Sequence, residues 1–192
     1  AAKSEGSFAA IPQEGGVVAI DTPFDARLAE INAALTKTVV VAGEGKARRE
    51  AGKKLEEARA LSAPAAADRA GFAGKTGAAG GGGFGGGFGV RDLLDDAIGK
   101  DGKADMKKVK ELKDAELPEE FKKLKTDKER SAYLEKKAAE RAKLNKEAVE
   151  LDKKRSDHIA AEMKKKGKGK DSFDSNVLEM LKKQSKKFEI EF

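Results

Sequence analysis

The stretch Thr126–Lys166, TDKERSAYLEKKAAERAKLNKEAVELDKKRSDHIAAEMKKK, decides the fold of this 192-residue chain. It contains neither glycine nor proline, and basic and acidic residues alternate along it over a weak apolar stripe. An uninterrupted helix over this range would be about 60 Å long at 1.5 Å per residue. The stretch therefore predicts one long, mostly solvated helix.

A capping box marks the start of this helix. Glu129 follows Thr126 by three residues, so each side chain can accept a hydrogen bond from the other residue's backbone amide. The apolar side of the helix is incomplete, which favours partial antiparallel pairing with another helix over a dimeric zipper. That side comprises Leu134, Ala138, Leu144, Ala148, Leu151, Ile159 and Met163, and it is interrupted by Arg141, Asn145, Asp152 and Arg155.

The expected partner of the long helix is the alanine-rich segment 46–73. Both surfaces are narrow and rich in small residues, so we expect the two helices to approach closely and run in opposite directions. The contact is expected to involve Ala58, Leu61, Leu144, Ala148 and Leu151. The result would be a helical hairpin or arm.

Composition limits the size of any single core. Charged residues make up 39% of the chain, aromatic residues only 5%, and there are 21 glycines. Because alanine buries little area, the apolar content cannot build a large core. We therefore predict a mainly α fold with a small β element and a small or split core.

The N-terminal segment 1–43 is expected to form a platform of a β-hairpin and a helix. Two short β-prone runs, 6–11 and 17–20, flank a turn with two glycines. Thr22 and Asp25 then predict a helix start, and an apolar face follows at Phe24, Leu28, Ile31 and Leu35. The run 38–41 is either a strand or the buried entry to the next helix, and a short extended segment is favoured.

The remaining segments follow from changes in composition. Pro64 must kink the helical segment 44–73 or begin a new helix within it. Segment 74–89 contains ten glycines and is predicted to be a flexible linker. Short helices are expected over 90–125, the long charged helix over 126–170, and a helix followed by a strand over 171–192. The strictly alternating run 188–192 predicts that C-terminal strand.

A lysine cluster follows the long helix. The formal net charge of +6 comes from 40 basic and 34 acidic residues, so the mixture is nearly balanced and nucleic-acid binding is not the leading expectation. The excess lies in Lys164, Lys165, Lys166, Lys168 and Lys170. These residues are either a solvated, flexible segment that ends the long helix or a segment that binds anions. They lack interleaved aromatic residues for base stacking.

Few residues are suited to catalysis or to holding a cofactor. The chain has no cysteine, and its one histidine, His158, is expected to be an exposed residue of the long helix rather than part of a catalytic pair. Gly74-Lys75-Thr76 lacks the earlier glycine of a phosphate-binding loop, and Leu112 stands where a calcium-binding EF-hand needs glutamate. Tyr133 is expected to pack against the preceding segment rather than stack on a ligand. We therefore expect no cofactor, no metal and no enzymatic activity.

Two parts of the chain carry a resemblance to a known family: 11–25, IPQEGGVVAIDTPFD, and 117–137, from LPEEF through TDKERSAYLEKK. They resemble the C-terminal region of certain bacterial proteins that contain a von Willebrand factor type A domain. The closing segment that starts at 171, DSFD, is similar as well. The metal-binding motif Asp-x-Ser-x-Ser of that domain is absent, because Phe173 replaces its first serine. The resemblance therefore implies no metal site.

The resemblance implies an accessory region that supports or presents an adhesion-type domain or assembles with a neighbouring subunit. It also implies an exported, periplasmic or cell-surface location. A protein partner or an adjacent domain is expected, and a homo-oligomer stays open. No apolar run approaches the roughly 20 residues that span a bilayer. The alternative is a nucleic-acid or anionic-surface binder that works through the lysine-rich segment 153–170.

Overall fold

The computed structural model describes residues 20–78, 90–165 and 182, and it is mostly helical over these residues. The prediction of a mainly α fold is confirmed. The predicted hairpin strands up to residue 19, the glycine-rich residues 79–89, and the C-terminal strand lie outside the described residues. So does the predicted terminal helix, apart from residue 182.

Seven helices and one 3-10 turn follow one another along the described residues. They are α1 (Asp25–Thr38), α2 (Gly45–Arg59), α3 (Ala63–Ala78), α4 (Leu93–Ala97), α5 (Met106–Lys110), η2 (Asp114–Glu116), α6 (Glu119–Lys122) and α7 (Asp127–Lys165). The chain divides into two compact units, one of residues 22–156 and one of residues 1–21 with 157–192. The contacts between helices described below lie within the unit 22–156.

Helix α1 begins at Asp25, close to the predicted start, but its N-cap is Phe24, which makes no side-chain cap hydrogen bond, and not Thr22. The Thr22 amide donates a hydrogen bond of 2.8 Å to Asp25 Oδ2, and the Phe24 amide donates one of 3.3 Å to Thr22 Oγ1. These bonds satisfy amides at the start of the helix, where no carbonyl of a preceding turn is available. Leu28, Ile31 and Leu35 are buried on one face, at the predicted helical spacing.

An extended segment follows α1 from residue 39, whereas Thr38, the first residue of the run expected to be extended, ends the helix. Val41 forms an antiparallel bridge with Asp92. The Leu93 amide donates to the Val40 carbonyl and the Ala42 amide to the Arg91 carbonyl, each over 2.9 Å. This short pairing ties the end of α1 to the start of α4. Gly43 then turns the chain with φ of 134°, a conformation that favours glycine.

The predicted boundary between the helical segment 44–73 and the linker 74–89 is wrong, because helix α3 extends across it. Pro64 lies in its first turn, so the proline begins a new helix and does not kink an existing one. The helix continues to Ala78, so residues 74–78 belong to a packed element and not to a linker. Glycine is a poor helix former, but here its lack of a side chain allows the close contact with α7 described below.

Helix α3 runs antiparallel to α7, as expected for the alanine-rich segment. Asp68 contacts Arg155, Lys75 contacts Asp152, and Gly77 lies against Asn145, so residue numbers rise on one helix as they fall on the other. The expected contacts of Ala58 and Leu61 with α7 are wrong. Ala58 belongs to α2, where its carbonyl accepts a hydrogen bond from Asn32 of α1, and the Leu61 side chain is exposed.

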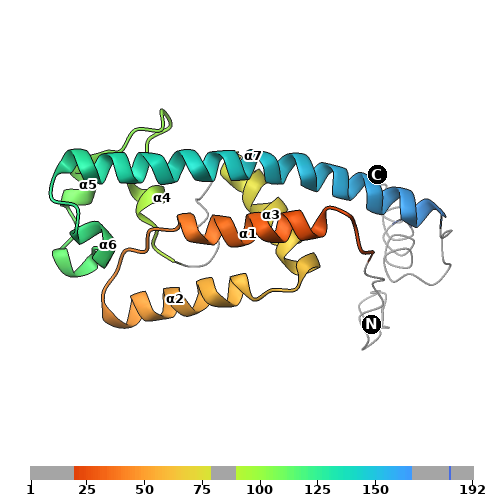
Figure 1. Cartoon of the computed structure of the whole chain (residues 1–192), viewed down its shortest axis with the longest axis horizontal. Coiled ribbons are helices and arrows are strands. Elements are labelled where there is room, and N and C mark those ends of the chain that lie inside the picture. The colour runs from red at the N-terminus through yellow and green to blue at the C-terminus, as the bar shows by residue number, and fades with distance from the viewer. Residues whose placement is uncertain (1–19, 79–89, 166–181, 183–192) are drawn as a thin grey trace. The chain divides into compact units, whose positions relative to one another are not determined.

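Two apolar clusters lie along α7. The first is formed mainly by α1, α2 and α3, and the second by α4, α5, α6 and the N-terminal part of α7. In Figure 1, α1 runs beside α7, and α4, α5 and α6 gather near its N-terminal end. Val39 belongs to the first cluster and Val40 to the second, so the extended segment after α1 joins them. The expectation of a split core agrees with this arrangement.

Candidate functional site: the polar seam of the long helix

The polar residues that interrupt the apolar side of α7 face the other helices. Arg141, Asp152 and Arg155 are buried, together with Leu134 and Ala148 on the same side. We call Arg141, Asn145, Asp152 and Arg155 the polar seam. Long charged side chains are rarely buried unless they are paired, so the three buried charged members of the seam need partners inside the fold.

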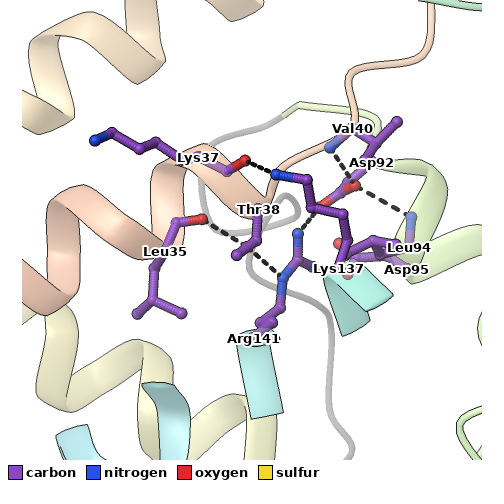
Figure 2. Close-up of polar contacts among 9 residues, drawn as sticks. All are labelled: Leu35, Lys37, Thr38, Val40, Asp92, Leu94, Asp95, Lys137 and Arg141. Carbon is purple, nitrogen blue, oxygen red and sulfur yellow. Dashed lines mark hydrogen bonds and ion pairs between the residues drawn. The ribbon is translucent and has the colours of Figure 1, made fainter. Parts of the chain in front are cut away.

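Arg141 binds three side chains from two other segments (Figure 2). Its Nε donates to Thr38 Oγ1 over 2.9 Å, and its two terminal nitrogens donate to Asp95 Oδ1 over 3.0 Å and to Asp92 Oδ2 over 2.5 Å. The Arg141 side chain is 9% exposed and that of Asp92 is fully buried. The planar guanidinium suits such multiple contacts because its donors point in fixed directions.

Asp92 connects this ion pair to the backbone. Its Oδ1 accepts hydrogen bonds from the Leu94 amide at 3.1 Å and the Val40 amide at 3.0 Å, so it caps α4 and also holds the extended segment. Thr38 donates its own hydroxyl to the Leu35 carbonyl over 2.7 Å. Nearby, Lys137 Nζ donates to the Lys37 carbonyl over 3.0 Å (Figure 2). Arg141 and Asp92 therefore bring the end of α1, the start of α4 and α7 together.

Arg155 makes a second contact of the same kind at the start of α1. Its Nε donates to Asp25 Oδ1 over 2.6 Å, and its Nη1 donates to Asp68 Oδ1 over 2.5 Å. Burial acts to raise the pKa of Asp25, but the hydrogen bonds from Thr22 and Arg155 outweigh it and hold that pKa below its usual value. Asp25 is therefore a carboxylate at neutral pH, and it both holds the turn before α1 through the Thr22 amide and binds α7.

Between these two arginines, α7 lies against the glycines of α3. A Cβ atom at Gly74 would lie 2.9 Å from the Asn145 carbonyl oxygen and 3.1 Å from the Ala148 Cβ. A Cβ atom at Gly71 would overlap the Asp152 carboxylate, which pairs with Lys75 Nζ at 2.6 Å. Only glycine at these positions allows the two helices to approach so closely.

The seam is suited to holding helices together. In both arginine contacts, a guanidinium of α7 binds the carboxylate at the start of another helix, and that carboxylate also accepts backbone amides. These bonds satisfy charged groups that would otherwise be buried without partners. The arrangement fixes three chain segments that are far apart in sequence.

The structure places the predicted lysine tract only in part. Lys164 and Lys165 are exposed in the last turn of α7, and Lys165 Nζ lies 2.6 Å from Glu162 Oε1. Lys166, Lys168 and Lys170 lie outside the described residues. Arg155, which the anion-binding hypothesis grouped with this tract, faces the protein interior, where it binds Asp25 and Asp68. That grouping is therefore wrong for Arg155.

Tyr133 and His158, the two residues considered as possible ligand-binding or catalytic residues from the sequence, both lie on α7. The Tyr133 ring packs edge-on against Phe121 with 6.1 Å between ring centroids, and its hydroxyl donates to Glu120 Oε1 over 2.9 Å. Burial and this hydrogen bond raise the pKa of Tyr133 above its usual value. The expected packing of Tyr133 is confirmed. His158 is partly buried, not exposed as expected.

Sequence reasoning found the arginines of the seam but missed their carboxylate partners. Asp92 and Asp25 are 49 and 130 residues away from the arginines that they bind, and no local pattern links such distant positions. The charged residues that interrupt the apolar side of α7 could have indicated these partners, because a charged residue on a core-facing side needs a partner inside the fold.

The described residues hold neither a metal-binding cluster nor a helix able to cross a bilayer. Within residues 20–78 and 90–165, no group of three histidine, aspartate or glutamate side chains is placed to hold a metal ion. None of the helices in this part of the chain combines the length and apolar character that crossing a bilayer requires. Comparisons with protein-family models, with characterised proteins and with solved structures found no match.

Proposed function

We propose that this chain is a non-enzymatic structural region that supports or presents an adjacent von Willebrand factor type A domain, or assembles with a neighbouring subunit. The observation that carries the proposal is the pair of arginine contacts. Arg141 and Arg155 each bind the start of a different helix to α7. Side chains that lock elements together in this way are typical of a part whose role is to keep a fixed geometry.

The surface of α7 that faces away from these contacts also supports the proposal. It presents exposed residues of both charges, among them Lys136, Glu140, Lys143, Glu150 and Lys154. A mixed surface of this kind suits reversible contact with another protein more than attraction to a uniformly charged polymer. The resemblance at 11–25 and 117–137 points to an adhesion-type domain as the neighbour, and to an exported, periplasmic or cell-surface location.

The experiment uses the complete protein that the gene encodes, including any domain adjacent to this chain. Residues 22–156 are deleted, and the thermal stability and ligand binding of the remaining domain are compared with those of the intact protein. A lowered Tm of that domain is the expected result. The matched control keeps every residue but replaces Arg141 and Arg155 with methionine. An unchanged Tm and unchanged binding after the deletion would contradict the proposal, as would turnover of a substrate that one substitution in this chain abolishes.

The alternative is binding to nucleic acid or another anionic surface through the exposed lysines near the end of α7. Lys153, Lys154, Lys164 and Lys165 are exposed, which favours this alternative. Binding of a fluorescent oligonucleotide and of vesicles with anionic lipids is measured at rising salt. Phosphate contacts predict that affinity falls steeply with salt concentration. Replacement of these four lysines by glutamine would abolish that binding if the alternative holds.

A further inference from the structure

The N-terminal part of α7, 127–141, and the following part, 145–156, differ in the apolar side chains that they bury. In the N-terminal part, 127–141, Leu134 is fully buried in the second apolar cluster, and Tyr133 packs on Phe121. The Arg130 guanidinium also lies 5.4 Å from the centre of the Phe121 ring. Aromatic and leucine side chains bury large apolar areas, so this part is anchored by the hydrophobic effect. We call 127–141 the anchor.

The following part, 145–156, adds little apolar area. Ala148 is its only fully buried member of the first cluster, while Leu151 is partly buried. The other buried members of that cluster are Leu28, Ile31, Leu35, Val39, Ala51, Leu55, Ala67, Ala70, Ala73 and Val90. Helices α1, α2 and α3 therefore bury most of this cluster against one another. Residues 145–156 contribute one fully buried residue, Ala148, to this cluster.

Ion pairs and glycine contacts hold 145–156 in place. Glu147 binds Arg27 over 2.7 Å, Asp152 binds Lys75 over 2.6 Å, and Arg155 binds Asp25. Both side chains of the Arg27–Glu147 pair are substantially exposed, and so is Lys75. The Arg155–Asp25 pair is buried, as is the Arg141–Asp92 pair in the anchor, so the two parts differ in apolar area and in exposed ion pairs, not in buried ones. Exposed ion pairs contribute little to stability, and the glycines of α3 offer no side chains to bury.

We infer that 145–156 is a strap that detaches from α1 and α3 while the anchor stays bound. The strap opens locally because the contacts that hold it are separate from those that hold the anchor. A helix of this length is marginal in water once its partner is lost, so its amide hydrogens exchange in the open state. The core beneath it persists, because α1, α2 and α3 pack on one another.

Native-state hydrogen exchange of the full chain, read by mass spectrometry, tests this inference. Peptides from 145–156 are expected to exchange at least about tenfold faster than peptides from 127–141. Peptides from α1 and α3 should keep their protection while the strap exchanges. Equal protection of strap and anchor, or loss of protection in α1 together with the strap, would overturn the inference.

A pair of glycine substitutions provides the matched control. Gly74→Ala places a methyl group against Asn145 and Ala148, so it should raise exchange in 145–156 by about another tenfold and leave 127–141 unchanged. Gly52→Ala on α2 meets nothing within 4 Å, so it should leave the strap unchanged. Equal acceleration of strap and anchor by Gly74→Ala, or no acceleration of the strap, would contradict a separate strap. If Gly74→Ala does not fold, the comparison of exchange in 145–156 and 127–141 of the unmodified chain tests the inference by itself.

Discussion

Arg141 and Arg27 both bind carboxylates, but only Arg141 is buried. The Arg141 and Asp92 side chains are 9% and 0% exposed, whereas those of Arg27 and Glu147 are 51% and 40% exposed. Arg141→Met would leave Asp92 buried without its cation and is expected to lower the free energy of unfolding by roughly 3–5 kcal/mol. Arg27→Met is the control and is expected to cost much less, because water screens this exposed pair. Urea unfolding followed by circular dichroism measures both, and similar losses would contradict this account of the Arg141 contact.

The depressed pKa of Asp25 links stability to pH. Since the folded state holds that pKa below the unfolded value, the unfolded state binds the extra proton as the pH falls. The stabilisation is complete above the unfolded pKa of about 3.9 and is lost as the pH falls through the lower folded value. The free energy of unfolding, measured with urea between pH 2 and 6, should therefore differ less between the unmodified chain and Asp25→Asn at pH 2 than at pH 6. A difference that does not change with pH would exclude this linkage.

At the scale of one element, the capping box of α7 is the clearest test. The Thr126 amide donates to Glu129 Oε2 over 3.0 Å, and the Glu129 amide donates to Thr126 Oγ1 over 3.2 Å. Thr126→Ala is expected to lower the free energy of unfolding by roughly 0.5–2 kcal/mol. Thr76→Ala on α3 removes a hydroxyl that bonds only carbonyls of its own helix, and it should be nearly neutral because alanine is the better helix former. Equal effects in thermal unfolding would argue against a special role for the cap.

How far the sequence predicts each element depends on where its determinants lie. The starts of α1 and α7 could be predicted to within a few residues because Thr22 and Thr126 act within one turn of the helix that follows them. Pro64 left open whether a helix kinks or begins there, and the structure shows that α3 begins there. The end of α3 could not be predicted. Gly74 and Gly77 have low helix propensity, and their helical state depends on contact with α7 about 70 residues later. The partners of Arg141 and Arg155 were missed for the same reason.

At the scale of the whole unit 22–156, the two apolar clusters are expected to unfold together. Val39 and Val40 are adjacent in the chain but lie in different clusters, and α7 contacts both. Leu35→Ala in the first cluster should lower stability by roughly 2–5 kcal/mol. Tyr133, the only tyrosine in a chain without tryptophan, packs against the second cluster and reports on it by fluorescence. In Leu35→Ala, the unfolding midpoint measured by Tyr133 fluorescence should decrease by the same amount as the midpoint measured by circular dichroism. Two separate midpoints would show that the clusters unfold independently.

The spacing of the two seam arginines also limits how this chain can change in length during evolution. Arg141 and Arg155 reach fixed carboxylates on opposite sides of the glycine contact with α3. One residue inserted between them would rotate everything after it by about 100° and carry Arg155 away from Asp25. Related chains should therefore gain and lose residues in the connections between helices, while the number of residues between these two arginines stays the same.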